Sequence, residues 1–324
     1  MQHTPERHGF RLGLAALTAA ASLGGTAACR NETPAAQDKP NTRVATGAPA
    51  PAPVAGQAEA RARLRDLERS YRGRIGVYAL DTGTGKTISY RDQESYPMLS
   101  TFKAMAAAAV LTKARRSEPG LLDRRIHWTP ADEVPTSPVT RGRGARGMTV
   151  AQLCEAAVTR SDNTAGNLIL RQIGGPRGLT AYLRSLGDRR SRLDRWETGL
   201  NLWRPGERRD TTTPASMGLN LWKVTLGAPL AAPDRERLNG WLRANTTGGA
   251  RIAAGLPDDW TVGDKTGTSN RYGAANDIAV AWPPSGAPLI IAIYTNRKAA
   301  DGTTDNTVIA RTATIAARGL GRLP

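Results

Sequence analysis

The sequence predicts an α/β fold, in which one five-stranded antiparallel sheet is flanked by terminal helices and carries an all-helical lobe. Two strand-like segments stand early in the chain and three stand late, with helical patterns between them. Strands close in sequence pair antiparallel through short turns, so both ends of the chain contribute to one sheet. The helices between the strands are then left to form a second lobe.

The early part of the folded region combines a helix with a hairpin. Residues 59–71 place Leu64 and Leu67 on one helical face. The strand-like segments 74–80 and 86–91 follow, separated by the turn residues DTGTG. We therefore expect a helix and then two paired strands.

The middle of the chain has helical patterns throughout. Residues 102–116 are rich in alanine, and residues 148–160 contain Thr149 with Gln152 three positions on, a capping-box signature. Several of the segments begin at Pro or Asp and end at Gly, which are common helix boundaries. The remaining helical patterns cover 166–173, 176–187, 214–227 and 234–245.

The last part of the chain returns to strands, at 260–268, 276–282 and 289–296, and closes with a helix at 306–320. The two terminal helices can cover one face of the sheet. A cleft between the sheet and the helical lobe is a natural place for a ligand.

The chain is strongly basic, with 45 Lys and Arg residues, 28 Asp and Glu residues and a formal net charge of +17. Such a charge suits a nucleic acid or the anionic polymers of a cell envelope. The arginines are spread along the chain, and the one dense run, RGRGAR at 141–146, contains no aromatic residue. Because no groove-reading motif accompanies the charge, we expect no nucleic-acid partner.

Residues 1–29 have the features of an export signal. Arg7 and Arg11 precede the apolar stretch 12–23, which is too short to span a bilayer comfortably. Small residues then lead to Cys29, as in bacterial lipoproteins, where this cysteine is lipidated. We expect an exported protein that is periplasmic, secreted or held at the cell surface as a lipoprotein, with membrane anchoring through lipidated Cys29.

Residues 30–57 are rich in Pro and Ala and lack the apolar residues that a core needs. This composition predicts a disordered tether, which would let a lipid-anchored domain stand off the membrane. The folded domain is then expected to cover residues 58–324, and we expect it to be a monomer.

Cysteine and histidine are too few for several kinds of site. Apart from Cys29, the only cysteine is Cys154, so the domain has no internal disulfide. Cys154 lies in an apolar helical pattern and is expected to be a buried, inert thiol. One cysteine and the single later histidine, His127, do not make a structural zinc site. We expect no metal or organic cofactor. If the protein is an enzyme, its proton chemistry is expected to use Lys, Glu or Ser.

The motif STFK stands where a helical pattern begins. Ser100 and Lys103 are three residues apart, so on a helix they lie on one face, one turn apart. The free N–H groups of a helix N-terminus can receive an oxyanion, and an amine within reach can activate the serine as a nucleophile. The spacing alone is a weak signal, because chance matches are common.

Two further motifs follow in the chain. In SDN, Ser161 can relay a proton and Asn163 offers an amide to a substrate carbonyl. In KTG, Lys265 and Thr266 can bind a carboxylate, and Gly267 lets a ligand approach the backbone. Taken singly, these patterns also fit a turn with a helix cap and the end of a strand.

Taken together and in this order, the three motifs resemble those of the penicillin-recognising serine enzymes, over about residues 60 to 320. This group includes the class A β-lactamases and the penicillin-binding proteins. Both acylate a serine with a β-lactam antibiotic, and they differ in whether the ester is then hydrolysed. The resemblance implies the serine β-lactamase/penicillin-binding-protein-like fold.

The segment RWETGLN at 195–201 decides between these two outcomes. It resembles the Ω-loop of class A β-lactamases, which implies that Glu197 activates the deacylating water and that Asn201 helps to hold it. Asp210 would pair with Arg195 and clamp the ends of the loop. The loop favours a β-lactam hydrolase that confers resistance. The alternatives are a penicillin-binding D-Ala-D-Ala carboxypeptidase or transpeptidase, or an acylated β-lactam sensor.

Several positions depart from the family pattern. Thr198 stands where many members have proline, and Ala107 stands where some have a cysteine that pairs with the one at Cys154. Ala274 occupies the place from which some members supply a substrate-binding arginine. Other members supply it from the segment before KTG, and Arg251 matches that position.

The resemblance also implies how an acyl-enzyme forms on Ser100. The backbone N–H groups of Ser100 and Thr268 would form the oxyanion hole. The acylation base stays open between Lys103 acting directly and Glu197 acting through water.

The same resemblance gives roles to the rest of the site. Ser161 would pass a proton to the departing ring nitrogen, and Asn163 would contact the acylamino side chain of a penicillin or a cephalosporin. The substrate carboxylate would be held by Lys265, Thr266 and Arg251.

Overall fold

The computed structural model describes residues 56–324. The expected export signal, lipidated Cys29 and most of the expected tether lie outside these residues. Helix α1 (Gly56–Tyr71) begins two residues before the expected start of the domain, at the end of the segment assigned to the tether. Within residues 56–324, no helix has the length and apolar character of a membrane span.

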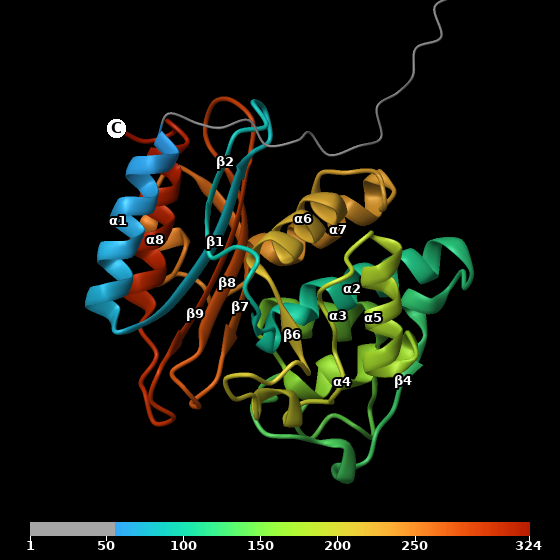
Figure 1. Cartoon of the computed structure of the whole chain (residues 1–324). Coiled ribbons are helices and arrows are strands. Elements are labelled where there is room, and N and C mark those ends of the chain that lie inside the picture. Colours follow the sequence, from blue (N-terminus) through green and yellow to red (C-terminus); the bar gives the residue numbers. More distant parts are fainter. Residues whose placement is uncertain (1–55) are drawn as a thin grey trace, which may run out of the picture. The chain divides into compact units, whose positions relative to one another are not determined.

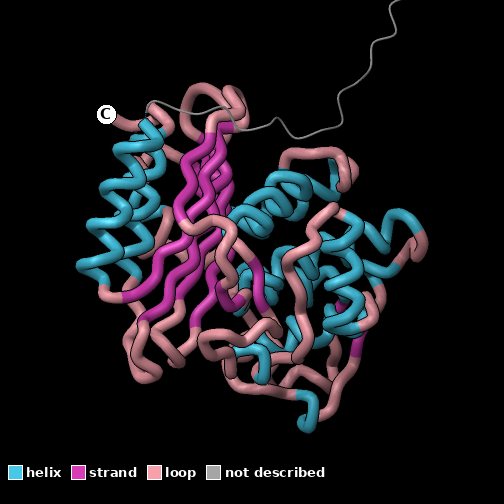
Figure 2. The backbone as a smooth tube through the Cα atoms, in the orientation of Figure 1, coloured by secondary structure: helices cyan, strands magenta, loops and turns pink. Residues whose placement is uncertain are grey.

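The predicted five-stranded sheet is confirmed, and all of its neighbouring strands are antiparallel (Figures 1 and 2). Its strand order is β2-β1-β9-β8-β7, so the first and last strands of the chain meet at its centre. The strands are β1 (Gly73–Asp81), β2 (Thr87–Tyr90), β7 (Thr261–Thr268), β8 (Ala275–Trp282) and β9 (Leu289–Arg297).

Helices α1 and α8 (Asn306–Gly319) lie together on one face of the sheet (Figure 1). Alternate side chains of a strand point to opposite faces, and β1 shows this division. Val77 and Ala79 belong to the core beneath the two terminal helices, while Tyr78 and Leu80 belong to the core shared with the helical lobe. The sheet is therefore buried on both faces, which explains why its strands β1, β8 and β9 are largely apolar.

The other face of the sheet packs against the helical lobe. Its central helix is α2 (Phe102–Arg116), which is buried on all sides from Phe102 to Leu111. Alanine at half of these positions lets neighbouring helices approach closely. The lobe also contains α3 (Val150–Thr159), α4 (Asn163–Gln172), α5 (Gly175–Ser185), α6 (Pro214–Thr225) and α7 (Ala232–Arg243).

Helix α3 has the two local features that its sequence predicted. Thr149 and Gln152 form the reciprocal capping box at its N-terminus. Cys154 is buried and free, and burial raises the pKa of its thiol. It therefore contributes a small apolar side chain to the core.

Two short ladders were not expected from the sequence. Strand β3 (Tyr96–Pro97) pairs with β6 (Thr211–Thr212), and β4 (Arg125–Ile126) pairs with β5 (Met148–Thr149). Two residues are too few to show a period in sequence. The first ladder matters for function, because it fixes the end of the Ω-like loop beside the segment that leads to Ser100.

Candidate active site

Ser100 lies in a single 3-10 turn, Leu99–Thr101, that runs directly into α2. Leu99 has a left-handed backbone with φ of 48°, a conformation that is uncommon for a residue with a branched side chain. Lys103 follows one turn later, as the motif predicted, and its Nζ lies 3.0 Å from Ser100 Oγ. The sharp turn and the helix thus present a hydroxyl and an amine together.

The loop carboxylate reaches the same point. Glu197 Oε1 lies 3.2 Å from Ser100 Oγ and 3.1 Å from Lys103 Nζ. The side chains of Lys103 and Glu197 are both fully buried. Burial lowers the pKa of Lys103, and the charge of Glu197 opposes that effect. The serine therefore has two basic groups within hydrogen-bond distance.

Contacts at several points hold the Ω-like loop in place. Asp210 accepts hydrogen bonds from the Arg195 side chain and from the backbone N–H of Arg195 at 2.9 Å, which is the predicted clamp. Asn167 donates to the carbonyl of Glu197 at 3.0 Å and accepts from its N–H at 2.9 Å. Asn201 Nδ2 donates to Glu197 Oε2 at 2.7 Å. The carboxylate is thus oriented from both its backbone and its side chain.

Two further features of the site concern the loop and its support from α4. The peptide bond between Glu197 and Thr198 is cis, with threonine where many members of the family have proline. Asn167 was missed in the sequence, although it lies four residues after Asn163 and therefore on the same face of α4. That spacing was the available signal.

Ser161 lies between the two buried lysines of the site. Its carbonyl accepts from Lys103 Nζ at 2.8 Å, and its Oγ accepts from Lys265 Nζ at 3.0 Å. Asn163 Oδ1 accepts from Lys103 Nζ as well, at 2.5 Å. Burial and the nearby charge of Lys103 lower the pKa of Lys265 to about 7. The hydroxyl of Ser161 is therefore placed to exchange a proton with Lys265, whereas the contact with Lys103 is made through the backbone carbonyl.

Arg251 is a buried part of the site wall, only 6% exposed. Its guanidinium donates to the carbonyls of Gly267 and Asn276, and to Thr268 Oγ1 at 2.7 Å. Burial lowers the pKa of Arg251, and the charges of Asp277 and Asp264 oppose that effect. Ala274, also buried, offers no charge.

A pair of buried aspartates on strands β7 and β8 was not found in the sequence. Asp264 and Asp277 lie on adjacent strands and are both buried. Asp264 accepts from Asn245 Nδ2 at 2.7 Å, and Asp277 accepts from the N–H of Ile252 at 3.0 Å. Burial raises the pKa of both carboxyl groups, and the charge of Asp264 raises that of Asp277 further. The pair thus supports the segment that carries Arg251.

Gly267 lets strand β7 pack closely against the nucleophile turn. A Cβ at this position would lie 3.2 Å from Ser100 N and 2.9 Å from the Cβ of Leu99. Any side chain would therefore push the strand away from the turn. The next residue, Thr268, is the second expected oxyanion donor, and this close packing keeps it beside Ser100.

These elements enclose a cleft of about 460 Å³ between the sheet and the helical lobe. Its volume lies in the range typical of small-molecule sites. Four other predicted residues lie behind the surface of the cleft and contact residues that line it: Lys103, Glu197, Lys265 and Gly267. The predicted residues that line the cleft are Ser100, Ser161, Asn163, Asn201, Arg251, Thr266 and Thr268. Within residues 56–324, no group of three or more His, Cys, Asp or Glu residues is arranged to hold a metal ion.

The fold and the site together fit a serine acyl-transfer enzyme with a carboxylate beside its serine. Comparison with known proteins gives the family. A model of the β-lactamase enzyme family matches residues 59–320. The chain is 48% identical over 308 residues to the β-lactamase AST-1 of Nocardia asteroides, an alignment that covers 95% of each protein. The chain therefore belongs to the β-lactamase enzyme family.

Other relatives refine this assignment. The carbapenem-hydrolyzing β-lactamase KPC of Klebsiella oxytoca is 50% identical over 255 residues, covering 79% of this chain and 87% of that one. A crystal structure of a β-lactamase from Streptosporangium roseum is 65% identical with a TM-score of 0.81, covering 82% of this chain and all of that one. Solved class A enzymes are also similar. The protein is a class A serine β-lactamase, and its hydrolysis of β-lactams confers resistance to them.

Proposed function

We propose that the enzyme opens the ring of penicillins and cephalosporins through an ester on Ser100. The observation that carries the proposal is that Ser100 Oγ lies within hydrogen-bond distance of both Lys103 and Glu197. Either group can take the hydroxyl proton as Oγ attacks the lactam carbonyl. The backbone N–H groups of Ser100 and Thr268 then stabilise the oxyanion, each by about 3 to 4 kcal/mol.

The ring nitrogen must receive a proton as the C–N bond breaks. Ser161 Oγ supplies it and is resupplied by the amine of Lys265, 3.0 Å away. The substrate carboxylate is held by Lys265 and Thr266, with Arg251 acting through Thr268 Oγ1. Asn163 lines the cleft and contacts the acylamino group. A matched test compares Arg251→Ala, which removes the charge, with Arg251→Lys, which keeps it. We expect KM for a penicillin to rise more in Arg251→Ala than in Arg251→Lys.

Deacylation depends on Glu197. Its carboxylate removes a proton from a water that Asn201 helps to position, and the hydroxide attacks the ester. Mass spectrometry of Glu197→Gln mixed with a penicillin should show the acyl adduct trapped, while the wild type returns to its free mass. Glu207→Gln is the matched control, because Glu207 lies in the same loop and pairs with Arg209 instead. A wild type that stays acylated would contradict these roles.

Turnover of a chromogenic cephalosporin tests the nucleophile and the substrate range together. Wild type should hydrolyse it and Ser100→Ala should not. Hydrolysis of penicillins without any cephalosporin turnover would remove cephalosporins from the proposal. Retained activity in Ser100→Ala would remove Ser100 as the nucleophile.

We further propose that the chain is exported and anchored at the membrane through lipidated Cys29, as a monomer. The sequence of residues 1–57 supports the export and the anchor. The large apolar side chains exposed within residues 56–324 are Trp196 and Leu202, which are too few for a dimer core. Replacement of Cys29 by Ser should release the protein from membranes, and light scattering of the soluble form should give one chain per particle. Unchanged membrane partition would contradict the anchor.

A further inference from the structure

A second pocket, of about 530 Å³, lies outside the catalytic cleft, beside β4 and α3. Arg143 and Arg146 of the basic run at 141–146 form part of its wall, and its only acidic side chain is that of Glu155. Four exposed arginines line it: Arg125, Arg143, Arg146 and Arg160. The pocket therefore has a strong excess of positive charge.

These arginines are not neutralised by the rest of the protein. Within residues 56–324, no carboxylate forms an ion pair with any of the four. Arg125 donates to the carbonyl of Gly147 at 3.0 Å, which positions its guanidinium without cancelling its charge. Neighbouring arginines behave differently, since Arg124 pairs with Glu118 and Arg171 pairs with Asp132. The charge of the pocket is thus available to an external anion.

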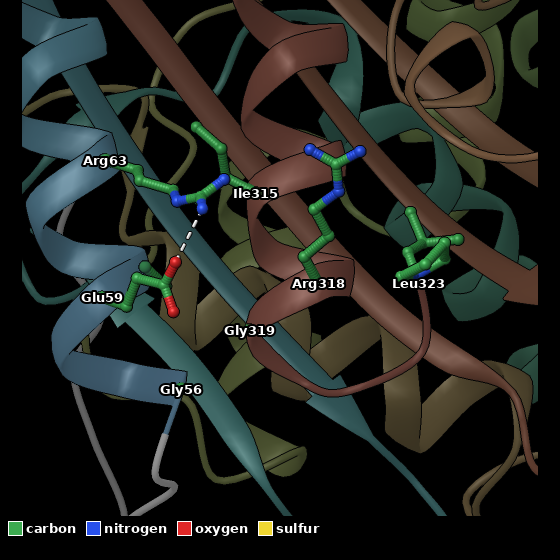
Figure 3. Close-up of a pocket in the computed structure, with 9 residues that line it drawn as sticks. Gly56, Glu59, Arg63, Ile315, Arg318, Gly319 and Leu323 are labelled. Atoms are coloured by element: carbon green, nitrogen blue, oxygen red, sulfur yellow. Dashed lines mark hydrogen bonds and ion pairs between the residues drawn. The ribbon is translucent and has the colours of Figure 1, made fainter.

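The groove between α1 and α8 differs from this pocket in its balance of basic and acidic side chains. Figure 3 shows Arg63 bonded to Glu59 at one end of it. Further along, Arg311 and Arg318 share the groove with Asp66, which pairs with Arg69, so the groove is lined by three arginines and two acidic residues against four and one in the pocket. Basic side chains are present there too, but acidic ones lie among them.

We propose that the arginine-lined pocket binds a linear, phosphate-bearing polymer of the cell envelope. Guanidinium groups bind phosphate oxygens in pairs, and a recessed pocket suits a chain better than a flat bilayer. Figure 1 places β4 at the opposite side of the domain from α1, the first described element of the chain. No aromatic residue lines the pocket, so the bases of a nucleic acid would have nothing to stack on.

Arg160 extends this surface toward the active site. It lines both the arginine-lined pocket and the catalytic cleft. A polymer bound in the pocket would therefore hold the enzyme with its cleft beside the envelope material. The choice of an envelope polymer rests on the proposed export, whereas the binding of a phosphate chain does not.

The test uses inorganic polyphosphate as the probe and fluorescence anisotropy as the measurement. Arg143→Glu with Arg146→Glu should weaken binding by at least about tenfold and flatten its dependence on salt. The matched control is Arg311→Glu with Arg318→Glu, which removes the same charge on the α1/α8 side and should change binding by less than about threefold. Hydrolysis of a chromogenic cephalosporin by each variant shows that it is folded.

Three results would overturn the proposal. The first is an equal loss of binding in both double variants, which would mean diffuse attraction to the whole basic surface. The second is tighter binding, through the same arginines, to vesicles of anionic phospholipid than to polyphosphate. The third is tighter binding to a single-stranded oligonucleotide with the same number of phosphates. None of these measurements depends on export, so failure of the export proposal is seen separately in the membrane partition of Cys29→Ser.

Discussion

The cleft has a floor formed by helix α2 and a wall formed by strand β7, and each contains one fully buried lysine. The two lysines have different partners. On the floor, Lys103 Nζ lies 3.1 Å from the carboxylate of Glu197. On the wall, Lys265 Nζ donates to the hydroxyl of Ser161 and to the carbonyl of Thr266. Burial lowers the pKa of both amines, and only Lys103 has a carboxylate in contact that opposes this effect. Lys103 can therefore exchange protons with its neighbours, whereas Lys265 is free to pair with a carboxylate of the substrate.

The largest effect should come from the floor. Lys103→Met removes the amine beside Ser100 and leaves Glu197 buried without its cation, so we expect kcat/KM for a penicillin to fall on the order of 10³-fold. Stopped-flow measurement of acylation should locate the loss in ester formation. Lys223→Met is the control, because Lys223 binds a backbone carbonyl away from the cleft. Acylation at the wild-type rate would leave Glu197 as the sole base.

A smaller effect is expected at the wall. Lys265→Met removes a charged hydrogen bond to the substrate carboxylate, and we expect kcat/KM to fall about 10- to 100-fold, mostly through KM. Lys265→Arg should restore much of the loss. If an ester of the same penicillin, which lacks the carboxylate, lost as much activity as the free acid, Lys265 would not be the carboxylate ligand.

The pH dependence of the same residue separates the two lysines further. The pKa of Lys265 is lowered to about 7, so in the free enzyme it is charged below that pH and becomes neutral above it. We expect kcat/KM for an anionic β-lactam to decline as the pH rises through about 7. Arginine stays protonated, so Lys265→Arg should lack this decline. Identical profiles for the two proteins would assign the decline to another group.

Much of this site could be predicted from the sequence, because its chemistry lies in short motifs. The three motifs and the loop carboxylate can be recognised from residue type, spacing and order along the chain, without knowledge of the fold. The aspartate pair could not be found in this way. Asp264 and Asp277 are neighbours because the register of β7 and β8 places Thr266 opposite Asp277. Both strands are buried on both faces, so they show no alternation of apolar and polar residues from which that register could be predicted. Two-residue ladders likewise depend on packing and not on periodicity.

The last prediction concerns that pair, which lies behind the wall lysine. Burial raises the pKa of Asp277, so its stabilising contribution is full below the ordinary aspartate pKa and is lost as the pH rises through the higher folded-state value. Asp277→Asn stays neutral and can still accept from the N–H of Ile252. We expect the melting temperature of the variant, relative to that of wild type at the same pH, to increase by a few degrees as the pH rises from 5 to 8.

Asp188 provides a control of opposite sign. Burial would raise the pKa of this aspartate, but hydrogen bonds from Ser191, Arg190 and Asn220 outweigh it, so the pKa is lowered. Its contribution is present above the ordinary aspartate pKa and is lost as the pH falls through the lower folded value. Asp188→Asn should therefore melt below wild type near neutral pH. If both substitutions lowered the melting temperature equally at pH 8, Asp277 would be held as a charged group. The field behind Lys265 would then be more negative than its lowered pKa implies.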